Sequence, residues 1–393
     1  MKKPPDDFFA RRFAPTALML GNIVTGCSVL APAGMLVELS GGLDVSIRTA
    51  GLLITFGAIM LCVGSPVTAW LTSRIERRSL LTVTLAVLAL TNAASAFAPD
   101  YTSLLVIRLV MLAVGALYTP QAAGTAALIV PVERRGSTIA YIFLGWSLAA
   151  AIGLPLITFV ASRYGWRMVY GGIAAMGCVS FLLLIWRLPR GLVGAPVDLK
   201  TWTDVGRYRM IILLLSITTL QMSGQFVVFT FIGPLLAKLT GAGGDAIGLV
   251  FACYGIFGFI GIAIATRIVD SWGAWKTSVL FTVLMLLGVT GWALSAGIYP
   301  LMAASVAIWG LGFASTNSMQ QVRLVGAAPA LASASVSLNT SVLYVGQAVG
   351  SAIGGLLYAR DWLYGAGYVA MAFVALALMM VILTKPRRTA DAR

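Results

Sequence analysis

Apolar segments of about 20 residues follow one another along the whole 393-residue chain, with charged residues between them. Such a segment is long enough to cross the hydrocarbon core of a bilayer as a helix. Only 10% of the residues are charged, against about 25% in soluble domains, and 59% are hydrophobic. The sequence therefore predicts an all-α integral membrane protein with twelve spans: 14–37, 47–71, 80–98, 103–126, 138–161, 168–187, 210–236, 246–268, 277–296, 300–322, 332–358 and 366–384.

The polar turn at 71–78 has a degenerate counterpart at 268–275, which is the mark of an internal repeat. The same shift aligns Gly51 with Gly248 and Gly64 with Gly261. At a slightly longer shift, Gly145 matches Gly346 and Gly153 matches Gly354. Secondary transporters built from internal repeats bind their substrate between the two halves, near the middle of the membrane. The sequence predicts two pseudo-symmetric six-helix bundles.

The longest polar stretch, 188–209, contains prolines, glycines and several basic residues. We interpret it as a cytoplasmic linker. The expected domains are an N-terminal bundle at 1–187, the linker at 188–209 and a C-terminal bundle at 210–393.

The distribution of Lys and Arg predicts the orientation, because basic residues favour short cytoplasmic loops. If both termini are cytoplasmic, the loops on the outer side hold only Arg48, Arg163, Arg167, Lys238 and Arg360. The net charge of +14 is then a signal of topology and of contact with anionic lipid, and no nucleic-acid partner is expected. We expect a multi-pass protein of the bacterial inner membrane, functioning as a monomer.

Several kinds of chemistry have no support in the sequence. The chain has no His and no phosphate-binding loop, so neither a metal site, nor a cofactor, nor an ATP motor is expected. The four cysteines all fall inside apolar spans: Cys27, Cys62, Cys178 and Cys253. We therefore expect a transporter that runs on gradients and is not an enzyme.

Local motifs add a resemblance to a known family. The turn between the second and third spans reads Ala69, Ser73, Arg74, Glu76, Arg77 and Arg78 where that family has Gly, Asp, Arg, Gly, Arg and Arg. The fourth span has Arg108 followed by Gly115, and the next stretch has Arg134-Arg135-Gly136, Gly145 and Gly153-Leu154-Pro155. These motifs resemble the major facilitator superfamily, and within it the drug-proton antiporter group and its sugar and arabinose efflux branch.

The resemblance implies roles for particular residues. It makes the basic turn, with Arg74, Arg77 and Arg78, a conformational latch between the halves. We interpret Arg267 and Asp270, at the end of the eighth span, as part of a cytoplasmic latch as well; the alternative for them is a solvated pair in a loop. It makes Gly145, Gly153 and Pro155 parts of an antiporter-motif helix. One departure concerns Val29, because efflux relatives commonly carry an acidic residue at this place ahead of a Pro-x-Gly, here Pro32-Ala33-Gly34.

No carboxylate falls in the middle of a predicted span, although proton antiport normally needs one whose pKa is raised by burial. The remaining candidate proton carriers are Glu38 and Asp270. Arg108 is the only charged residue well inside a span. It either contacts substrate or the coupling ion, or it bonds helix carbonyls and extends toward the membrane surface.

Neutral polar residues in the spans suit sugars, nucleosides or other uncharged solutes better than lipophilic cations. The alternative for each of them is a hydrogen bond between helices. The predicted substrate-binding residues are Arg108, Asn22, Gln121, Gln221, Gln225, Tyr254, Asn317 and Asn339.

The sequence as a whole predicts a secondary transporter that exports a small solute (a sugar, a nucleoside or a drug-like molecule) by alternating access, with proton antiport implied by the resemblance. Val29 and the acid-free interior favour an alternative, an uncoupled facilitator or importer with the same fold. A membrane receptor or scaffold lacks a soluble signalling segment here. An integral-membrane enzyme lacks a His cluster or an acid pair in mid-membrane.

Overall fold

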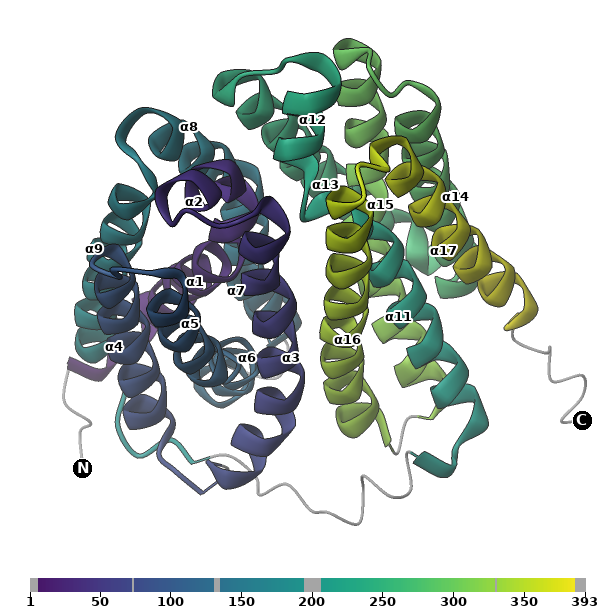
Figure 1. Cartoon of the computed structure of the whole chain (residues 1–393). Coiled ribbons are helices and arrows are strands. Elements are labelled where there is room, and N and C mark those ends of the chain that lie inside the picture. The colour runs from purple at the N-terminus through teal and green to yellow at the C-terminus, as the bar shows by residue number, and fades with distance from the viewer. Residues whose placement is uncertain (1–5, 73, 131–134, 194–205, 329–330, 386–393) are drawn as a thin grey trace, which may run out of the picture.

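Two bundles of helices stand side by side in the computed structural model, which describes residues 6–72, 74–130, 135–193, 206–328 and 331–385 (Figure 1). Every regular element within these ranges is a helix. The first bundle ends with α9 at Arg187, and the second begins with α11 at Arg209. The last described residues after α9 and the start of α11 both lie at the lower end of the view, which we call the linker side.

The first bundle contains nine α-helical segments and a π-helical turn, η2, in its described part. Their bounds are α1 Asp6–Gly34, α2 Leu36–Gly42, α3 Ile47–Leu71, α4 Arg77–Ala96, α5 Tyr101–Gly115, α6 Tyr118–Ile129, α7 Arg135–Leu148, η2 Ala149–Gly153, α8 Leu154–Tyr164 and α9 Trp166–Arg187. The second bundle consists of α11 Arg209–Phe229, α12 Ile232–Thr240, α13 Gly244–Trp272, α14 Ala274–Leu294, α15 Tyr299–Ala327, α16 Ala332–Ala359 and α17 Leu363–Leu383.

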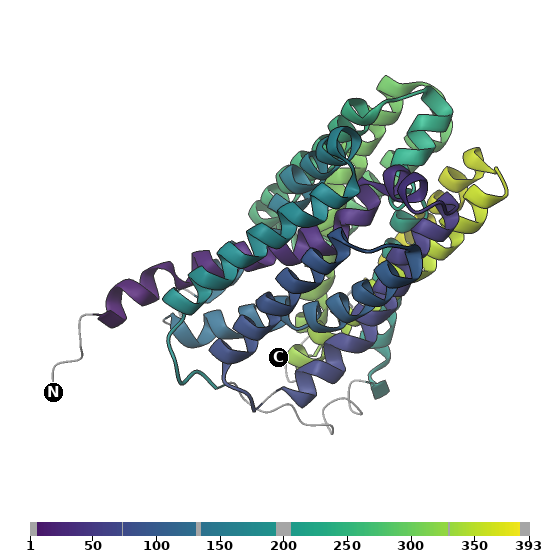
Figure 2. The ribbon, with the colours of Figure 1, turned by 60° about the vertical axis from the view of Figure 1, so that its left-hand side comes forward.

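Eleven helical segments in the described part of the chain are long and apolar enough to cross a membrane. The twelfth expected span, 300–322, forms the continuous helix α15, which is 29 residues long. Its linker-side half carries the polar residues Asn317, Gln320, Gln321 and Arg323, which lower its hydropathy. The rotated view in Figure 2 shows the long helices running side by side along one common direction, as expected for a bundle that spans a bilayer.

Three spans that the sequence predicts as continuous, 14–37, 103–126 and 210–236, are interrupted. The break between α5 and α6 begins at Ala116, four residues before Pro120, and the break between α11 and α12 begins at Thr230, four residues before Pro234. Proline has no N–H to bond the carbonyl four residues earlier, and its ring crowds that carbonyl. The first span breaks at Met35, directly after Pro32-Ala33-Gly34.

The internal repeat is confirmed by equivalent contacts in the two bundles. A Cβ atom on Gly145 of α7 would meet the backbone of α1 at Met19, and one on Gly346 of α16 would meet the backbone of α11 at Thr219. The other matching contacts are Gly153 with Cys27, Gly354 with Val227, Gly64 with Ala113 and Gly261 with Leu311. These six glycines are therefore places where helices of one bundle approach closely, whereas the repeat pair Gly51 and Gly248 meets Phe231 and Pro155 of the opposite half.

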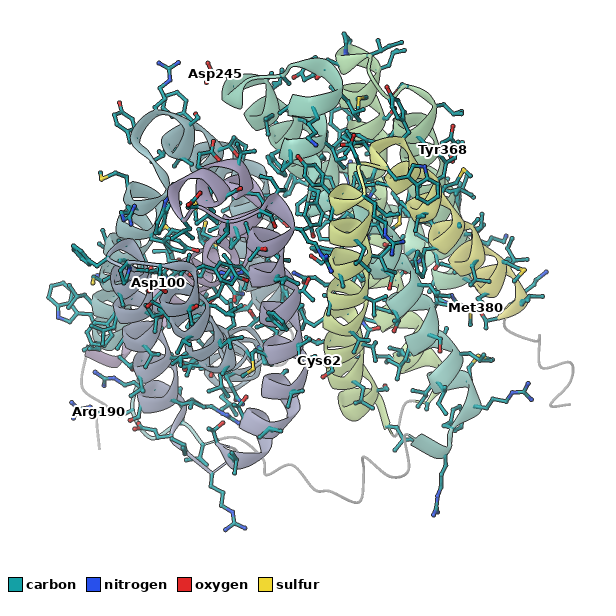
Figure 3. All side chains as sticks on the ribbon, in the orientation of Figure 1. Cys62, Asp100, Arg190, Asp245, Tyr368 and Met380 are labelled. Atoms are coloured by element: carbon teal, nitrogen blue, oxygen red, sulfur yellow. The ribbon has the colours of Figure 1, made fainter. Side chains whose placement is uncertain are left out.

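The two halves touch mainly on the side opposite the linker. There α13 packs along α8 and η2, and α12 meets α2, while α3 packs on α16 over a longer stretch that extends to Met60 and Tyr344 in the middle of the membrane. Arg163 donates to Asp245 across the halves at 3.3 Å; Figure 3 shows Asp245 at this end and Arg190 at the linker end. Helices α7 and α8 belong to one span, with α7 on the linker side. Because α13 packs closely on α8 and only slightly on α7, the seam between α13 and this span is tighter on the side opposite the linker.

Candidate functional site

Arg108 lies on α5 and is fully buried at the centre of the first half. Its Nε donates to the carbonyl of Leu53 at 2.9 Å, Nη1 to the carbonyl of Ser28 at 2.9 Å and Nη2 to the carbonyl of Val29 at 2.8 Å. The guanidinium thus ties α5 to α1 and α3. These carbonyl bonds use all three nitrogens of the side chain, which matches the alternative role given above for Arg108.

Pro32 explains why one of these carbonyls needs a side-chain donor. In a regular helix the N–H of residue 32 would bond the carbonyl of Ser28, but proline has no N–H. Nη1 of Arg108 supplies the missing donor to that oxygen. The carbonyl of Val29 accepts from Arg108 Nη2, at the position where the resemblance leads one to expect an acid. Arg108 is therefore satisfied by backbone oxygens in place of a carboxylate.

Asn22 on α1 is the centre of a polar cluster in the first half. Its Nδ2 donates to the carbonyl of Ile142 at 2.9 Å, and its Oδ1 accepts from Thr119 Oγ1 at 2.8 Å. Trp146 Nε1 donates to the same hydroxyl at 3.0 Å. Asn22 is buried, whereas Thr119 and Trp146 are half-buried. The cluster therefore joins α1, α6 and α7 and leaves a hydroxyl and an indole partly accessible.

Gln225 on α11 has the corresponding role in the second half. Its Oε1 accepts from Tyr254 Oη at 3.3 Å and from Trp309 Nε1 at 3.1 Å. The rings of Tyr254 and Trp309 meet edge to face at 5.5 Å, and the half-buried ring of Phe313 lies 5.2 Å from Tyr254. The surroundings of Gln225 thus combine one amide with several aromatic rings.

The other predicted amides in the second half also bond between helices. Asn339 Oδ1 accepts from Thr218 at 2.7 Å, and its Nδ2 donates to Asn317 Oδ1 at 2.9 Å. Gln221 Nε2 donates to Thr282 at 2.9 Å. Asn317 is half-buried, and the rest are buried. In the first half, Gln121 accepts from the Arg77 guanidinium.

One cluster brings side chains of both halves together. Val29 and Leu61 are buried there, and the half-buried Met60, Trp146 and Tyr344 pack against them. Tyr344 comes from α16 of the second half, whereas the others come from the first. The candidate substrate site is therefore the region between the halves that Trp146 and Tyr344 border, at the depth of Val29.

The residues Thr119, Trp146, Trp309 and Tyr344 are missing from the prediction made from sequence. A signal was available for the two tryptophans, because an indole N–H inside a membrane needs an acceptor and so marks a polar contact. Their bonds to Thr119 and Gln225 show that the aromatic residues belong to the same polar clusters as the predicted amides.

The predicted antiporter-motif helix contains a π-helical turn. Gly145 packs on α1, then η2 occupies Ala149–Gly153, and Pro155 follows in the first turn of α8. Pro155 cannot donate to the carbonyl of Ala151, and a wider turn is one way for a helix to absorb that loss. Gly255 of α13 lies directly against the backbone of Ala151, so this turn forms part of the seam between the halves.

The predicted latch residues bond within the first half in this conformation. Besides its bond to Gln121, Arg77 donates its backbone N–H to the carbonyl of Leu192 at 2.7 Å, and Arg78 Nη2 donates to the carbonyl of Ile185 at 2.6 Å. Arg74 and Arg267 are exposed. Ser73, Arg134 and the side chains of Arg135 and Asp270 lie outside the described residues. A latch between the halves remains a prediction for a conformation closed on the linker side.

The glutamate of this turn has both carboxylate oxygens occupied. Gly191 donates its N–H to Glu76 Oε1 at 2.6 Å, and the Ser79 hydroxyl donates to Oε2 at 2.8 Å. These two bonds, the first above all, lower the pKa of the Glu76 carboxyl. Glu76 therefore fastens the beginning of the linker to the start of α4.

Within the described spans the only carboxylate is Asp245, which is exposed at the first turn of α13. Glu38 is half-buried on α2, just beyond the first span, and α2 contacts α12 of the other half. Burial raises the pKa of the Glu38 carboxyl, and a backbone N–H offsets part of that rise. Of the two candidate proton carriers, Glu38 is the one whose surroundings the structure describes.

A sequence model of the Major Facilitator Superfamily matches residues 18–349, with a further match over 214–393. The chain belongs to the major facilitator superfamily. The second match begins where the second bundle begins, in keeping with the duplication.

Known transport proteins resemble the chain over most of its length. The inner membrane transport protein YdhP of Escherichia coli is 31% identical over 94% of this chain and 95% of its own length. A chloramphenicol efflux pump of Mycobacterium tuberculosis is 26% identical over 84% of this chain and 82% of its own. The crystal structure of a D-xylose-proton symporter has a TM-score of 0.78 at 14% identity and covers 95% of this chain and 98% of that one, which shows the shared fold.

These findings confirm the predicted family, the all-helical membrane fold and the assignment as a transporter rather than an enzyme. The protein is a multi-pass inner-membrane member of a superfamily of small-solute transporters. The efflux function of one relative agrees with the efflux group that the motifs resemble.

Proposed function

We propose that this protein exports a small uncharged solute by alternating access and binds it between the two halves at the depth of Trp146 and Tyr344. The supporting observation is the pair of polar and aromatic clusters around Asn22 and Gln225, which the structure forms without any carboxylate in the described middle of the membrane. Amides and hydroxyls suit a solute with hydroxyl groups, and aromatic rings suit its apolar face. A buried acid would instead favour a cation.

The proposal agrees with the solutes named for the relatives. Chloramphenicol and D-xylose are both uncharged molecules that carry hydroxyl groups. They differ in that chloramphenicol has an aromatic ring, which would pack against the indole of Trp146 or the ring of Tyr344. We therefore take chloramphenicol as the first solute to test and D-xylose as the second.

We assign the linker side to the cytoplasm because most Lys and Arg residues lie there. Arg163 meets Asp245 and α13 packs on α8 on the opposite side, which supports the interpretation of this conformation as inward-facing. In the exporter, solute then enters between the halves from the cytoplasm. In the coupled form of the proposal, Glu38 is the proton-binding group, since it lies half-buried beside the seam that opens and closes.

The second candidate function is an uncoupled facilitator, favoured by the absence of a carboxylate deep in the described spans and by Val29. Vesicles with a trapped pH dye distinguish the two. Chloramphenicol flux with proton movement in the opposite direction, abolished in Glu38→Gln, supports the coupled exporter. Flux without proton movement, unchanged in Glu38→Gln, supports the facilitator.

The site itself is tested by Trp146→Phe, which keeps an aromatic ring and removes the N–H that Thr119 accepts. This bond holds the indole and the Thr119 hydroxyl in place at the border of the site. We expect its loss to cost about 1 kcal/mol of solute-binding free energy, which lowers the chloramphenicol flux about fivefold at subsaturating solute. Trp292→Phe is the matched control, because Trp292 is a buried tryptophan of α14 away from the seam. Equal flux in the two variants would place the solute elsewhere.

A further inference from the structure

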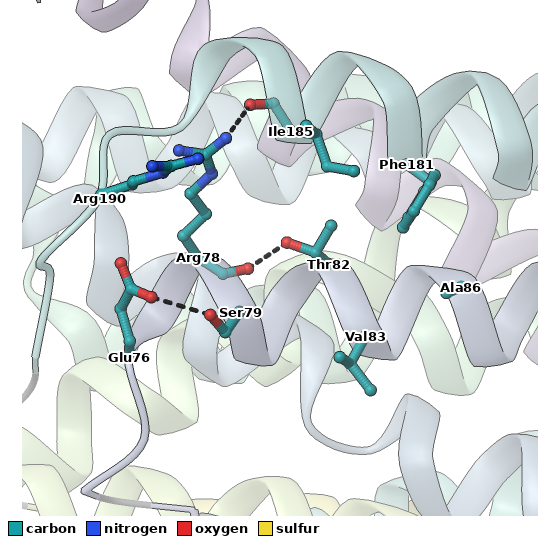
Figure 4. Close-up of a pocket in the computed structure, with 9 residues that line it drawn as sticks. All are labelled: Glu76, Arg78, Ser79, Thr82, Val83, Ala86, Phe181, Ile185 and Arg190. Atoms are coloured by element: carbon teal, nitrogen blue, oxygen red, sulfur yellow. Dashed lines mark hydrogen bonds between the residues drawn. The ribbon is translucent and has the colours of Figure 1, made fainter.

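A cavity of about 490 Å³ lies between α4 and α9, at the linker end of the first bundle and away from the seam between the halves. Figure 4 shows its two ends. One end is polar and holds Glu76, Arg78 and Arg190, and the other is apolar and holds Val83, Ala86 and Phe181. The cavity is therefore amphiphilic, and the solute site described above does not use it.

The polar end carries more positive than negative charge. Arg78 and Arg190 lie close together there (Figure 4), with Glu76 as the carboxylate that lines the same cavity. Both oxygens of Glu76 already accept hydrogen bonds, from Gly191 and Ser79. Arg78 uses Nη2 on the carbonyl of Ile185, which leaves its other N–H groups available, and Arg190 is exposed. This arrangement is complementary to a single anion.

The wall around the cavity faces lipid. Val83 and Leu90 on α4 are 60% and 69% exposed, and Leu182 on α9 is 61% exposed. Large apolar side chains exposed to this extent on a membrane helix contact acyl chains. Trp186, 78% exposed near the end of α9, is a residue type enriched where hydrocarbon meets headgroups. The apolar end of the cavity thus lies at acyl-chain depth, and the arginine end lies at headgroup depth.

We propose that this cavity binds one anionic phospholipid of the linker-side leaflet, with its phosphate on Arg78 and Arg190 and an acyl chain along Val83, Ala86 and Phe181. Guanidinium groups bond phosphate oxygens in pairs, which suits two arginines at one end. The bound phosphate would join the start of α4 to the chain that follows α9. Glu76 and Gly191 already join these same segments, so the lipid strengthens the attachment of the linker to the first half.

The test is native mass spectrometry of the full-length protein titrated with phosphatidylglycerol or phosphatidylcholine of identical acyl chains. The first tightly bound phosphatidylglycerol should be retained over phosphatidylcholine, and the double variant Arg78→Gln, Arg190→Gln should reduce this preference by about thirtyfold, as expected for two arginines near a charged bilayer surface. The matched control, Arg207→Gln with Arg209→Gln, removes two exposed arginines at the start of the second bundle. If both double variants lower the preference equally, binding is only general surface attraction and the proposal is wrong.

A second variant tests the acyl-chain half of the site without changing charge. Ala86→Trp fills the apolar end and should weaken retention of phosphatidylglycerol by at least tenfold, with the elution volume of the protein unchanged. Unchanged retention would overturn the proposed position of the acyl chain. Water-soluble glycerol 3-phosphate should not compete at equal concentration, and full competition would show a site for a free phosphate instead of a lipid.

Discussion

Replacing Arg108 by methionine removes a buried cation and three hydrogen bonds while keeping most of the side-chain volume. A hydrogen bond from a charged donor contributes about 1.5–3 kcal/mol, so the three bonds to Ser28, Val29 and Leu53 represent about 7 kcal/mol. Removing a cation from the middle of the membrane returns about 3 kcal/mol. We expect Arg108→Met to lower the free energy of unfolding by about 4 kcal/mol.

Pro32 makes this prediction more specific. Without Arg108, the carbonyl of Ser28 has no backbone N–H within its own helix to bond it, because residue 32 is proline. The substitution Pro32→Ala supplies that N–H. In the Arg108→Met background it should therefore recover about 1 kcal/mol, whereas in the wild-type protein the oxygen already has a donor and the gain should be smaller. The two substitutions should be coupled in a double-mutant cycle.

The measurement is reversible unfolding of the four proteins of the cycle in mixed micelles, followed by circular dichroism. Arg360→Met is the control, because Arg360 is an exposed arginine after the end of α16, and it should change the free energy of unfolding by less than about 0.5 kcal/mol. Stability of Arg108→Met within about 1 kcal/mol of wild type would refute the account of Arg108 as a tie among α1, α3 and α5. If the effects of Pro32→Ala and Arg108→Met on the free energy of unfolding are additive, Arg108 does not replace the N–H donor that Pro32 lacks for the carbonyl of Ser28.

Two further predictions concern the seam opposite the linker, and both are read from the distance between spin labels at Tyr164 and Leu249, which lie on opposite halves. Gly255→Val places a side chain against the backbone of Ala151, so the halves cannot close there and the distance should lengthen; an unchanged distance would contradict the role of Gly255. Burial raises the pKa of Glu38 in this conformation, and we expect opening of the seam to expose the carboxyl and return its pKa toward the ordinary value. Protonation then favours the conformation closed at this seam, so lowering the pH through the raised pKa should shorten the mean distance, and raising the pH should lengthen it. Glu38→Gln should hold the short distance at every pH, and a pH response that persists in this variant would assign the titration to another group.

The repeat was predictable from sequence at the level of individual glycines. The alignment of Gly64 with Gly261 and of Gly145 with Gly346 identified positions where helices meet backbone to backbone. This works because only glycine permits such close approach, so the contact leaves a mark in the sequence. Pro120 and Pro234, which follow two of the helix breaks, are also visible in the sequence. The breaks were not predictable from them, because a proline within a long apolar segment does not by itself show whether a helix kinks or stops.

The partners of the polar side chains were not predictable in the same way. Amides of similar kind lie on many helices, and the choice of Asn317 for Asn339, or of Trp309 for Gln225, depends on how the helices are rotated and stacked. The basic turn illustrates the same limit. Its sequence predicts a latch between halves, but in this conformation Arg77 and Arg78 bond Gln121 and the carbonyl of Ile185 within one half.

The sequence by itself determined that this protein spans the membrane many times, that it is a duplicated six-helix unit, and that a cation, Arg108, lies well inside the fourth span. These properties follow from hydropathy, spacing and the cost of burying charge, all of which act along the chain. Only the tertiary structure decided that Arg108 binds backbone oxygens, that Trp146 and Tyr344 border one site, and that Arg78 and Arg190 share one cavity. Each of these depends on side chains of different helices meeting in space, and that is set by helix packing rather than by any local pattern.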